Sequence, residues 1–162
     1  MSDLVKDPVC GMQVDSRQHV TEYLETHYAF CSPQCQERFL ANPHLYIGLP
    51  GQKAPKQKGD EVLKQRRLHL SEILTSNRAE KLIEALQTMM GIKSVSVKGD
   101  NIVITYDLLQ ATAEQIELKM AEIGVQLGKG WSEQLRRAFV HSEEELEVGS
   151  LEVRKEKHYR HH

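Results

Sequence analysis

The chain has 162 residues, of which 40% are hydrophobic and 27% charged, and its formal net charge at pH 7 is -2. This composition is typical of a soluble globular protein with one domain or two small ones, and the near-neutral charge argues against general nucleic-acid binding. The sequence has no long apolar run and no basic-then-apolar leader, so it predicts neither a membrane span nor a signal peptide, and we expect a cytoplasmic protein with reduced thiols.

Three cysteines near the N-terminus give the strongest chemical signal in the sequence. Cys10 is followed by Gly11, which allows a tight backbone turn, and Cys31 and Cys35 stand one helical turn apart. An odd number of thiols cannot pair completely into internal disulfides, and sulfurs one turn apart can converge on one ion. The pattern therefore predicts a metal site formed by Cys10, Cys31 and Cys35. The alternative is three reduced, buried cysteines, since free cysteine is among the most buried residue types.

The residues between the cysteines predict how the chain brings them together. Two short strands, at residues 19–23 and 27–30, suggest a hairpin that folds Cys10 back toward Cys31. Ser32 is a preferred N-cap and Pro33 suits the first helical position, which places Cys35 at the third position of a helix. Free backbone N–H groups and the helix dipole favour a thiolate there, so we expect Cys35 to be the most readily deprotonated of the three.

A wider set of residues frames these cysteines and carries a resemblance to a known family. The set is Lys6 to Met12, Tyr23, Tyr28 to Ser32, Cys35, Phe39, Asn42, Pro43 and Tyr46. Residues 1–48 thereby resemble the YHS domain, a small TRASH-like relative of treble clefs and zinc ribbons. The resemblance implies metal handling, because the family occurs beside copper-transporting P-type ATPases and also in some multicomponent monooxygenases. Glu25 departs from the family, which usually has Gly in the hairpin turn.

The identity of the metal depends on how many ligands surround it. Met12 is a candidate thioether ligand, and His27, four residues before Cys31, is a candidate imidazole ligand. Zinc prefers four ligands in a structural site, whereas three thiolates, with or without Met12, suit a monovalent copper ion. Together with the family resemblance, this favours copper(I), with zinc as the alternative.

Residues 49–65 predict a basic linker. The segment combines Gly, Pro and repeated Lys and shows no apolar periodicity. An exposed, solvated linker is the main interpretation. Docking to an acidic partner or to an anionic membrane surface is the alternative.

Residues 66–128 alternate between strand and helix patterns in the order βαββαβ. Strand patterns lie near residues 68–70, 95–97, 102–106 and 125–127, and helix patterns near 79–90 and 112–123. Asn77 with Glu80, and Thr112 with Gln115, have the spacing of capping pairs. The order predicts a ferredoxin-like sandwich with both helices on one face of the sheet.

This second domain resembles the heavy-metal-associated domain of copper chaperones and ATPase N-termini. The residues that carry the resemblance are Ala79 to Leu86, Met90 to Ile92, Val95 to Val97, Tyr106, Asp107 and Gly124. In that family a Cys-x-x-Cys pair precedes the first helix, but Thr75 and Arg78 stand at those positions here. Neither is a soft ligand, so the resemblance implies a retained fold without its metal site, used for docking, dimerisation or regulation. Met89, Met90 and Met120 at helical spacing are more typical of core fillers than of ligands.

An apolar helical stripe follows over residues 129–148. Its members are Trp131, Leu135, Ala138, Phe139, Ser142 and Leu146, with Ser132 as the expected N-cap. The helix either packs against its own domain or docks a partner or a second copy. In the tail, residues 149–162, His158, His161 and His162 could bind metal weakly; the alternative is a solubilising end or an expression remnant.

The sequence therefore predicts an α+β, cytosolic, non-enzymatic metal-binding protein. A treble-clef-like YHS module would hold copper(I) for metal trafficking, storage or homeostasis, in the manner of a metallochaperone. The ferredoxin-like domain would dock onto a metal transporter, a metalloenzyme or another copy of the chain. The competing hypothesis is an interaction or regulatory protein with structural zinc. An enzyme is the weakest hypothesis, because no Ser/His/Asp order, phosphate loop or paired carboxylates stand out.

Overall fold

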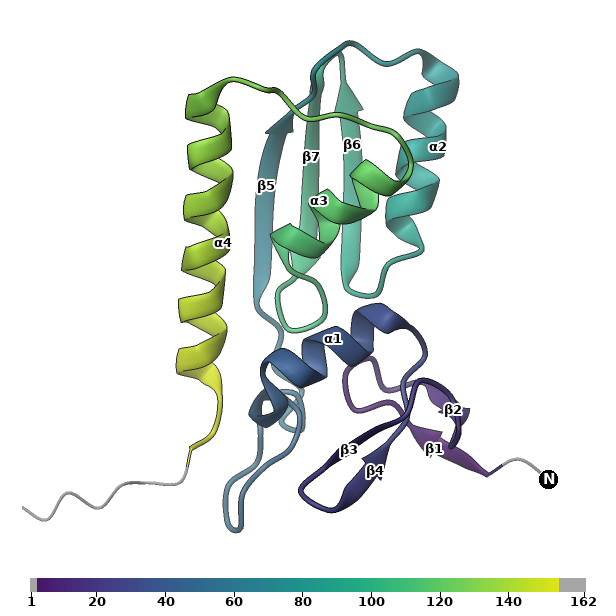
Figure 1. Cartoon of the computed structure of the whole chain (residues 1–162), viewed down its shortest axis with the longest axis vertical. Coiled ribbons are helices and arrows are strands. Elements are labelled where there is room, and N and C mark those ends of the chain that lie inside the picture. Colours follow the sequence, from purple (N-terminus) through teal and green to yellow (C-terminus); the bar gives the residue numbers. More distant parts are fainter. Residues whose placement is uncertain (1–2, 155–162) are drawn as a thin grey trace, which may run out of the picture.

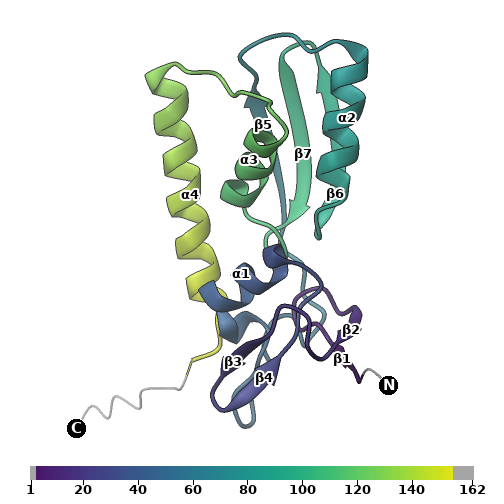
Figure 2. The same cartoon turned by 45° about the vertical axis from the view of Figure 1, so that its right-hand side comes forward.

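The computed structural model describes residues 3–154 and confirms the predicted α+β class (Figures 1 and 2). In chain order, the elements are β1 (Leu4–Lys6), β2 (Gln13–Asp15), β3 (Thr21–Tyr23), β4 (Thr26–Tyr28), α1 (Pro33–Ala41), a 3-10 turn η1 (Pro43–Leu45), β5 (Leu63–His69), α2 (Ser76–Gln87), β6 (Ile92–Lys98), β7 (Asn101–Asp107), α3 (Ala113–Glu122) and α4 (Trp131–Leu151). Among these residues, no helix is both long enough and apolar enough to cross a bilayer.

Two small hairpins and α1 form the N-terminal module. β1 pairs with β2 and β3 pairs with β4, both antiparallel. The predicted hairpin is present, although its strands are shorter than expected. Its turn consists of Leu24 and Glu25, whose φ angles of 49° and 65° lie in the left-handed region. A two-residue turn with two positive φ angles matches the twist of paired strands. Glu25 adopts this conformation at the position where the family usually has Gly.

A three-stranded antiparallel sheet, in the order β5-β7-β6, forms the centre of the second domain. Ile102, Ile104 and Tyr106 of β7 alternate toward one face and are fully buried. α2 and α3 cover that face, as the ferredoxin-like prediction requires (Figure 1). The other face is open to solvent, and its strand residues are mainly polar.

The expected fourth strand is reduced to a single bridge between Leu70 and Leu127. Flanking bonds from Ser71 N–H to the Gln126 carbonyl and from Gly128 N–H to the His69 carbonyl, each 2.9 Å, complete the contact. The chain then leaves the sheet to begin α4 at Trp131, so too few residues remain to extend the pairing.

Helix starts match the predictions only in part. Thr112 and Gln115 form the expected capping box at the start of α3. The predicted cap of α2 by Asn77 is wrong, because Thr75 is the N-cap and its hydroxyl accepts the Arg78 N–H at 3.3 Å. Ser132 is likewise not the cap of α4, which begins after Gly130 without any side-chain cap.

α4 lies along α3 and the β5 edge of the sheet through a polar face. The buried Glu144 carboxylate accepts the Ala113 N–H at 2.6 Å and the hydroxyl of Tyr106. Glu117 of α3 accepts from His141 at 2.7 Å and from Arg66 at 3.0 Å. The helix therefore packs against its own domain, as one of the two interpretations predicted, but the predicted apolar stripe is not the face that packs.

One hydrophobic core joins the N-terminal module to the second domain. Tyr46, after α1, donates its hydroxyl to the carbonyl of Leu109. The expected linker is not wholly exposed: Ala54 is fully buried, and the Lys56 N–H donates to the Leu45 carbonyl at 2.9 Å. In Figures 1 and 2, α1 lies against the end of the sheet domain, between the sheet and the small hairpins.

Candidate metal centre

The structure brings all three cysteines together. The sulfur of Cys31 lies 3.5 Å from that of Cys10 and 3.5 Å from that of Cys35. All three are free thiols, with Cys35 buried and the other two half-buried. Thiolates bound tetrahedrally at about 2.3 Å from one ion lie about 3.8 Å from one another, so these sulfurs are close to coordination spacing. The donor set therefore fits a soft ion with little rearrangement.

Local sequence explains where each sulfur is placed. Cys10 lies in the tight turn between β1 and β2, where the Gly11 N–H donates to the Asp7 carbonyl at 2.9 Å and Gly11 has a φ of 80°. An L side chain at Gly11 would be strained in this left-handed conformation. Ser32 caps α1, and its hydroxyl accepts the Cys35 N–H at 3.4 Å. The predicted cap and the predicted position of Cys35 in the first helical turn are confirmed.

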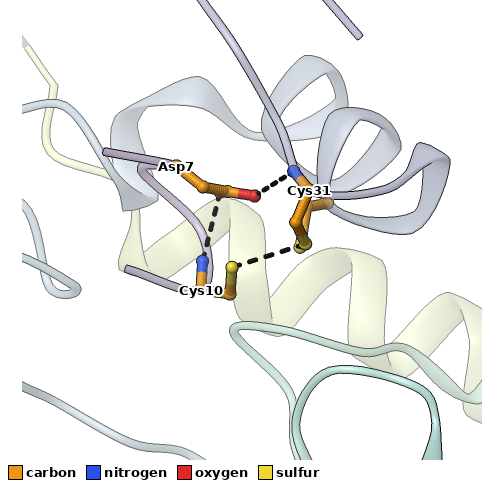
Figure 3. A group of neighbouring side chains, drawn as sticks. Asp7, Cys10 and Cys31 are labelled. Carbon is orange, nitrogen blue, oxygen red and sulfur yellow. Dashed lines mark hydrogen bonds between the residues drawn. The ribbon is translucent and has the colours of Figure 1, made fainter. Parts of the chain in front are cut away.

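Asp7 is the residue of this centre that sequence reasoning missed. Its side chain is fully buried, and its ligand oxygen and the three sulfurs all lie within 4.8 Å of one another. One carboxylate oxygen accepts from Val9 N–H at 2.7 Å and Cys10 N–H at 3.2 Å, and the other accepts from Cys31 N–H at 2.8 Å. Figure 3 shows the bonds to Cys10 and Cys31. Asp7 thus holds the two cysteine-bearing segments against each other. The sequence offered one signal for this role: an Asp side chain often accepts the backbone N–H two residues later in a turn, as Asp7 does with Val9.

Hydrogen bonding and burial separate the acidities of the three thiols. The pKa of Cys10 falls from 9.0 to about 7, chiefly through the neighbouring Cys35 thiol. Burial raises the pKa of Cys31 to about 11. The pKa of Cys35 is also raised, first by the neighbouring Cys10 sulfur and then by burial. The expectation that Cys35 deprotonates first is not supported, because the neighbouring Cys10 sulfur and burial raise its pKa in spite of its place in the first turn of α1.

The other predicted ligands lie apart from this group. His27 is exposed in β4, where it pairs across the hairpin with Glu22, and it is not one of the clustered donors. Met12 is 48% exposed and lines a cleft beside Cys31. His158, His161 and His162 lie outside the described residues.

The cleft beside Cys31 runs between α1 and the second domain and has a volume of about 720 Å³. Met12, Cys31, Met89 and Met90 contribute sulfur-bearing side chains to its lining, with Lys119 at its α3 wall. Met120, by contrast, is fully buried, as expected of a core filler. The cysteine centre therefore has one buried side, at Cys35, and one side that opens on a methionine-lined cleft.

The loop before α2 holds no comparable group. Arg78, at the sequence position where the resemblance implies the second cysteine, contacts Glu72 at 2.6 Å and the Gly124 carbonyl at 3.5 Å. Within residues 3–154, Asp7 and the three cysteines are the one cluster of His, Cys, Asp or Glu side chains close enough to share an ion.

Comparison with known families agrees with the predicted module. Residues 5–49 match the model of the YHS domain, which confirms the resemblance inferred for residues 1–48. This match contains all three cysteines and Asp7. No curated protein matches the chain as a relative.

Solved structures with a similar fold include three metal-related proteins. Oxidised MerP from Ralstonia metallidurans CH34 is 16% identical, with 41% of this chain and 96% of that chain covered and a TM-score of 0.39. A putative copper-ion-binding protein from Bacillus anthracis is 14% identical, with 42% and 99% covered and a TM-score of 0.40. The soluble region of the P-type ATPase CopA from Bacillus subtilis is 17% identical, with 41% and 46% covered and a TM-score of 0.40.

Proposed function

We propose that the protein binds one soft metal ion, copper(I) in preference to zinc, through Cys10, Cys31 and Cys35. It would act in the cytosol as a non-enzymatic protein of metal trafficking, storage or homeostasis. The observation that carries this proposal is the spacing of the three sulfurs, two of them 3.5 Å from Cys31, in a module that matches the YHS domain. Three thiolates without a fixed fourth donor suit the low coordination number of copper(I).

The uneven burial of the sulfurs supports exchange of the ion. Cys35 is fully buried on α1, whereas Cys10 and Cys31 are half-buried and Cys31 lines the open cleft. A competing ligand can approach from the cleft while Cys35 still holds the ion. Thioether sulfur is a weak, soft donor, so Met12 beside Cys31 would assist a copper ion on that path without trapping it.

Asp7 would act as a positioning residue in this site. Its carboxylate fixes the backbone on both sides of the sulfurs, through Cys10 N–H and Cys31 N–H. Its carboxylate also opposes ionisation of Cys10 and Cys35, an effect smaller than that of the neighbouring thiols, and a bound cation would offset it. Groups that orient metal ligands typically affect metal affinity 10-fold to about 100-fold.

A structural zinc site is the second candidate, and the position of Asp7 is what favours it. Its carboxylate lies within the same 4.8 Å group as the sulfurs, so a Cys3Asp set could supply the four ligands that zinc prefers. Such a site would stabilise the N-terminal module and release its metal slowly. The protein would then serve as an interaction or regulatory module.

Anaerobic competition distinguishes the two candidates. The apo protein would be titrated with copper(I) and with zinc against chelators of known affinity, and the holo protein would be challenged with free thiol ligand. The copper proposal predicts one equivalent of copper(I), preferred over zinc and released within minutes to the competitor. Preference for zinc, with loss of far-UV circular dichroism when the zinc is stripped, would support the structural site instead. His27→Ala is the control, because His27 lies outside the group and its removal should change neither affinity.

The second domain would dock onto a partner, so that the metal centre faces that partner, and it would not bind metal itself. Arg78, in the first turn of α2, stands where the resembled family has a metal-binding cysteine, and Gln34 bonds α1 to the second domain next to the cysteines. A metal transporter or a metalloenzyme with an accessible soft site is the kind of partner we propose. Retained metal binding with lost transfer in a surface variant of this domain would test that role.

A further inference from the structure

α4 exposes its apolar face and packs with its polar face. The exposed fractions of the large side chains on the stripe are 78% for Trp131, 62% for Leu135, 63% for Phe139 and 76% for Leu146. The opposite face carries the buried Glu144 and Val148. In Figure 1, α4 stands at the outer edge of the molecule, beyond β5. An ordered helix with this orientation presents a continuous apolar strip that nothing in the described chain covers.

We propose that a second copy of the chain covers this strip, through an antiparallel α4–α4 pair about a two-fold axis. The stripe is self-complementary in that arrangement. An axis between residues 140 and 141 places Leu135 opposite Leu146 of the partner, and Phe139 opposite Ser142 of the partner. The first pair joins two leucines and the second sets a large side chain against a small one. Each contact occurs twice, as an isologous interface requires.

The charged residues that flank the stripe favour the same antiparallel orientation of the two helices. Arg136 and Glu143 are exposed and lie seven residues apart, two turns along one flank of α4. In an antiparallel pair, flanks on the same side meet, so Arg136 faces Glu143 of the partner, again twice. In a parallel pair the two-fold axis runs along the helices, so this flank meets the opposite flank of the partner and Arg136 does not face Glu143. The opposite signs therefore favour the antiparallel arrangement and select the same register as the apolar contacts.

The arrangement leaves both metal centres accessible. The C-terminal end of α4 is fastened to the N-terminal module, since Glu152 accepts from the Asn42 side chain at 2.8 Å. In Figure 2 the N-terminal module lies at the C-terminal end of α4, so an antiparallel pair sends the two YHS modules to opposite ends of the dimer. One helix pair buries less area than the roughly 1,600 Å² of a standard stable interface, so we expect a weak dimer, with a dissociation constant on the order of micromolar.

The first test measures self-association of the full chain by sedimentation velocity from about 1 to about 300 μM. The wild type should shift from monomer to dimer over this range. Phe139→Glu should remain monomeric with an unchanged circular dichroism spectrum, because Phe139 has no packing role within the monomer. Ile73→Glu is the matched control, an equally exposed aliphatic side chain away from α4, and should still dimerise. A wild type that stays monomeric at every concentration, or a Phe139→Glu dimer, would overturn the proposal.

The second test reverses the charges and addresses the register. Arg136→Glu alone and Glu143→Arg alone should each weaken the dimer about tenfold, since each creates two like-charge contacts. An equimolar mixture of the two variants should form heterodimers as strong as the wild type, because both opposed pairs are then attractive. The double variant should recover self-association for the same reason. If the mixture associates no better than its components, the proposed antiparallel register is wrong.

Discussion

The side-chain amide of Gln34 and the backbone of Met90 hydrogen-bond in both directions. Nε2 donates to the Met90 carbonyl at 2.8 Å, and Oε1 accepts the Met90 N–H at 3.0 Å. The same Nε2 also donates to the Gln110 carbonyl at 2.9 Å. Because Gln34 directly precedes Cys35, these bonds fasten the helix that carries a candidate ligand to the end of the sheet domain.

Removing this side chain should weaken the whole protein. Gln34→Ala leaves the Met90 N–H and two carbonyls without their partners, so we expect the free energy of unfolding to fall by roughly 1–3 kcal/mol. The measurement is urea unfolding of the apo protein, where one shared core predicts one transition for the wild type. Gln134→Ala, at an exposed position of α4, is the control and should change little. Equal midpoints for Gln34→Ala and the wild type, or two separate wild-type transitions, would contradict the shared core.

Adjacent glutamates on α4 offer a matched pair of substitutions. Glu144 is buried and accepts from Ala113 N–H and from the Tyr106 hydroxyl, whereas Glu145 is exposed. Glu144→Ala leaves both donors without an acceptor. It should lower the free energy of unfolding by about 2–3 kcal/mol, since hydrogen bonds to a charged group are among the stronger ones. Glu145→Ala should change it by less than about 0.5 kcal/mol. Similar losses from the two substitutions would mean that α4 is not anchored through Glu144.

Alkylation should modify Cys10 first in the reduced apo protein. The thiolate is the reactive form, and its fraction increases as the pH rises through the pKa. The rate at Cys10 should therefore increase with a midpoint near pH 7, while Cys31, with a pKa of about 11, stays slow through pH 9. Peptide mapping after short iodoacetamide pulses gives both rates. Fastest modification at Cys35, or a Cys10 midpoint near pH 9, would show that Cys35 does not lower the pKa of Cys10 in solution.

Asp7→Asn should weaken metal binding without removing a sulfur. An amide replaces one of the two acceptor oxygens by an NH2 group, which cannot accept the backbone N–H groups that now point at the carboxylate. We expect metal affinity to fall 10-fold to about 100-fold, with a smaller loss for copper(I) than for zinc if the oxygen also ligates zinc. Asp60→Asn, in an exposed ion pair with Lys58, is the control. Unchanged affinity for both metals would show that Asp7 does not organise the centre.

The sequence predicted the parts of this structure that depend on local chemistry. The Ser32 cap, the Thr112 capping box and the convergence of the three cysteines follow from spacing and helix geometry, and the structure contains all three. Alternation along β7 similarly predicted which side chains face the helices.

The features that sequence reasoning missed depend on contacts distant in the chain. The distant partner of Asp7, the N–H of Cys31, lies 24 residues away, so its role becomes visible only once the hairpins are folded. The apolar stripe on α4 was correctly located, but periodicity cannot say which face packs; Tyr106 and Ala113, more than 30 residues earlier, decide it by binding Glu144. The acidity of Cys35 was misjudged for a similar reason, because Cys10 and burial outweigh the local helix dipole.

The most direct test of the central claim is the copper(I) stoichiometry of the wild type and of Cys31→Ser under anaerobic conditions. Cys31 lies between the other two sulfurs, 3.5 Å from each neighbour, so its loss leaves two thiols without the donor that joins them. We expect one tightly held equivalent in the wild type, and affinity lower by orders of magnitude in Cys31→Ser with an unchanged circular dichroism spectrum. We also expect no tight binding when Cys10, Cys31 and Cys35 are all Ser. Full occupancy in Cys31→Ser, or tight binding by the triple variant, would show that the three cysteines do not form the metal site.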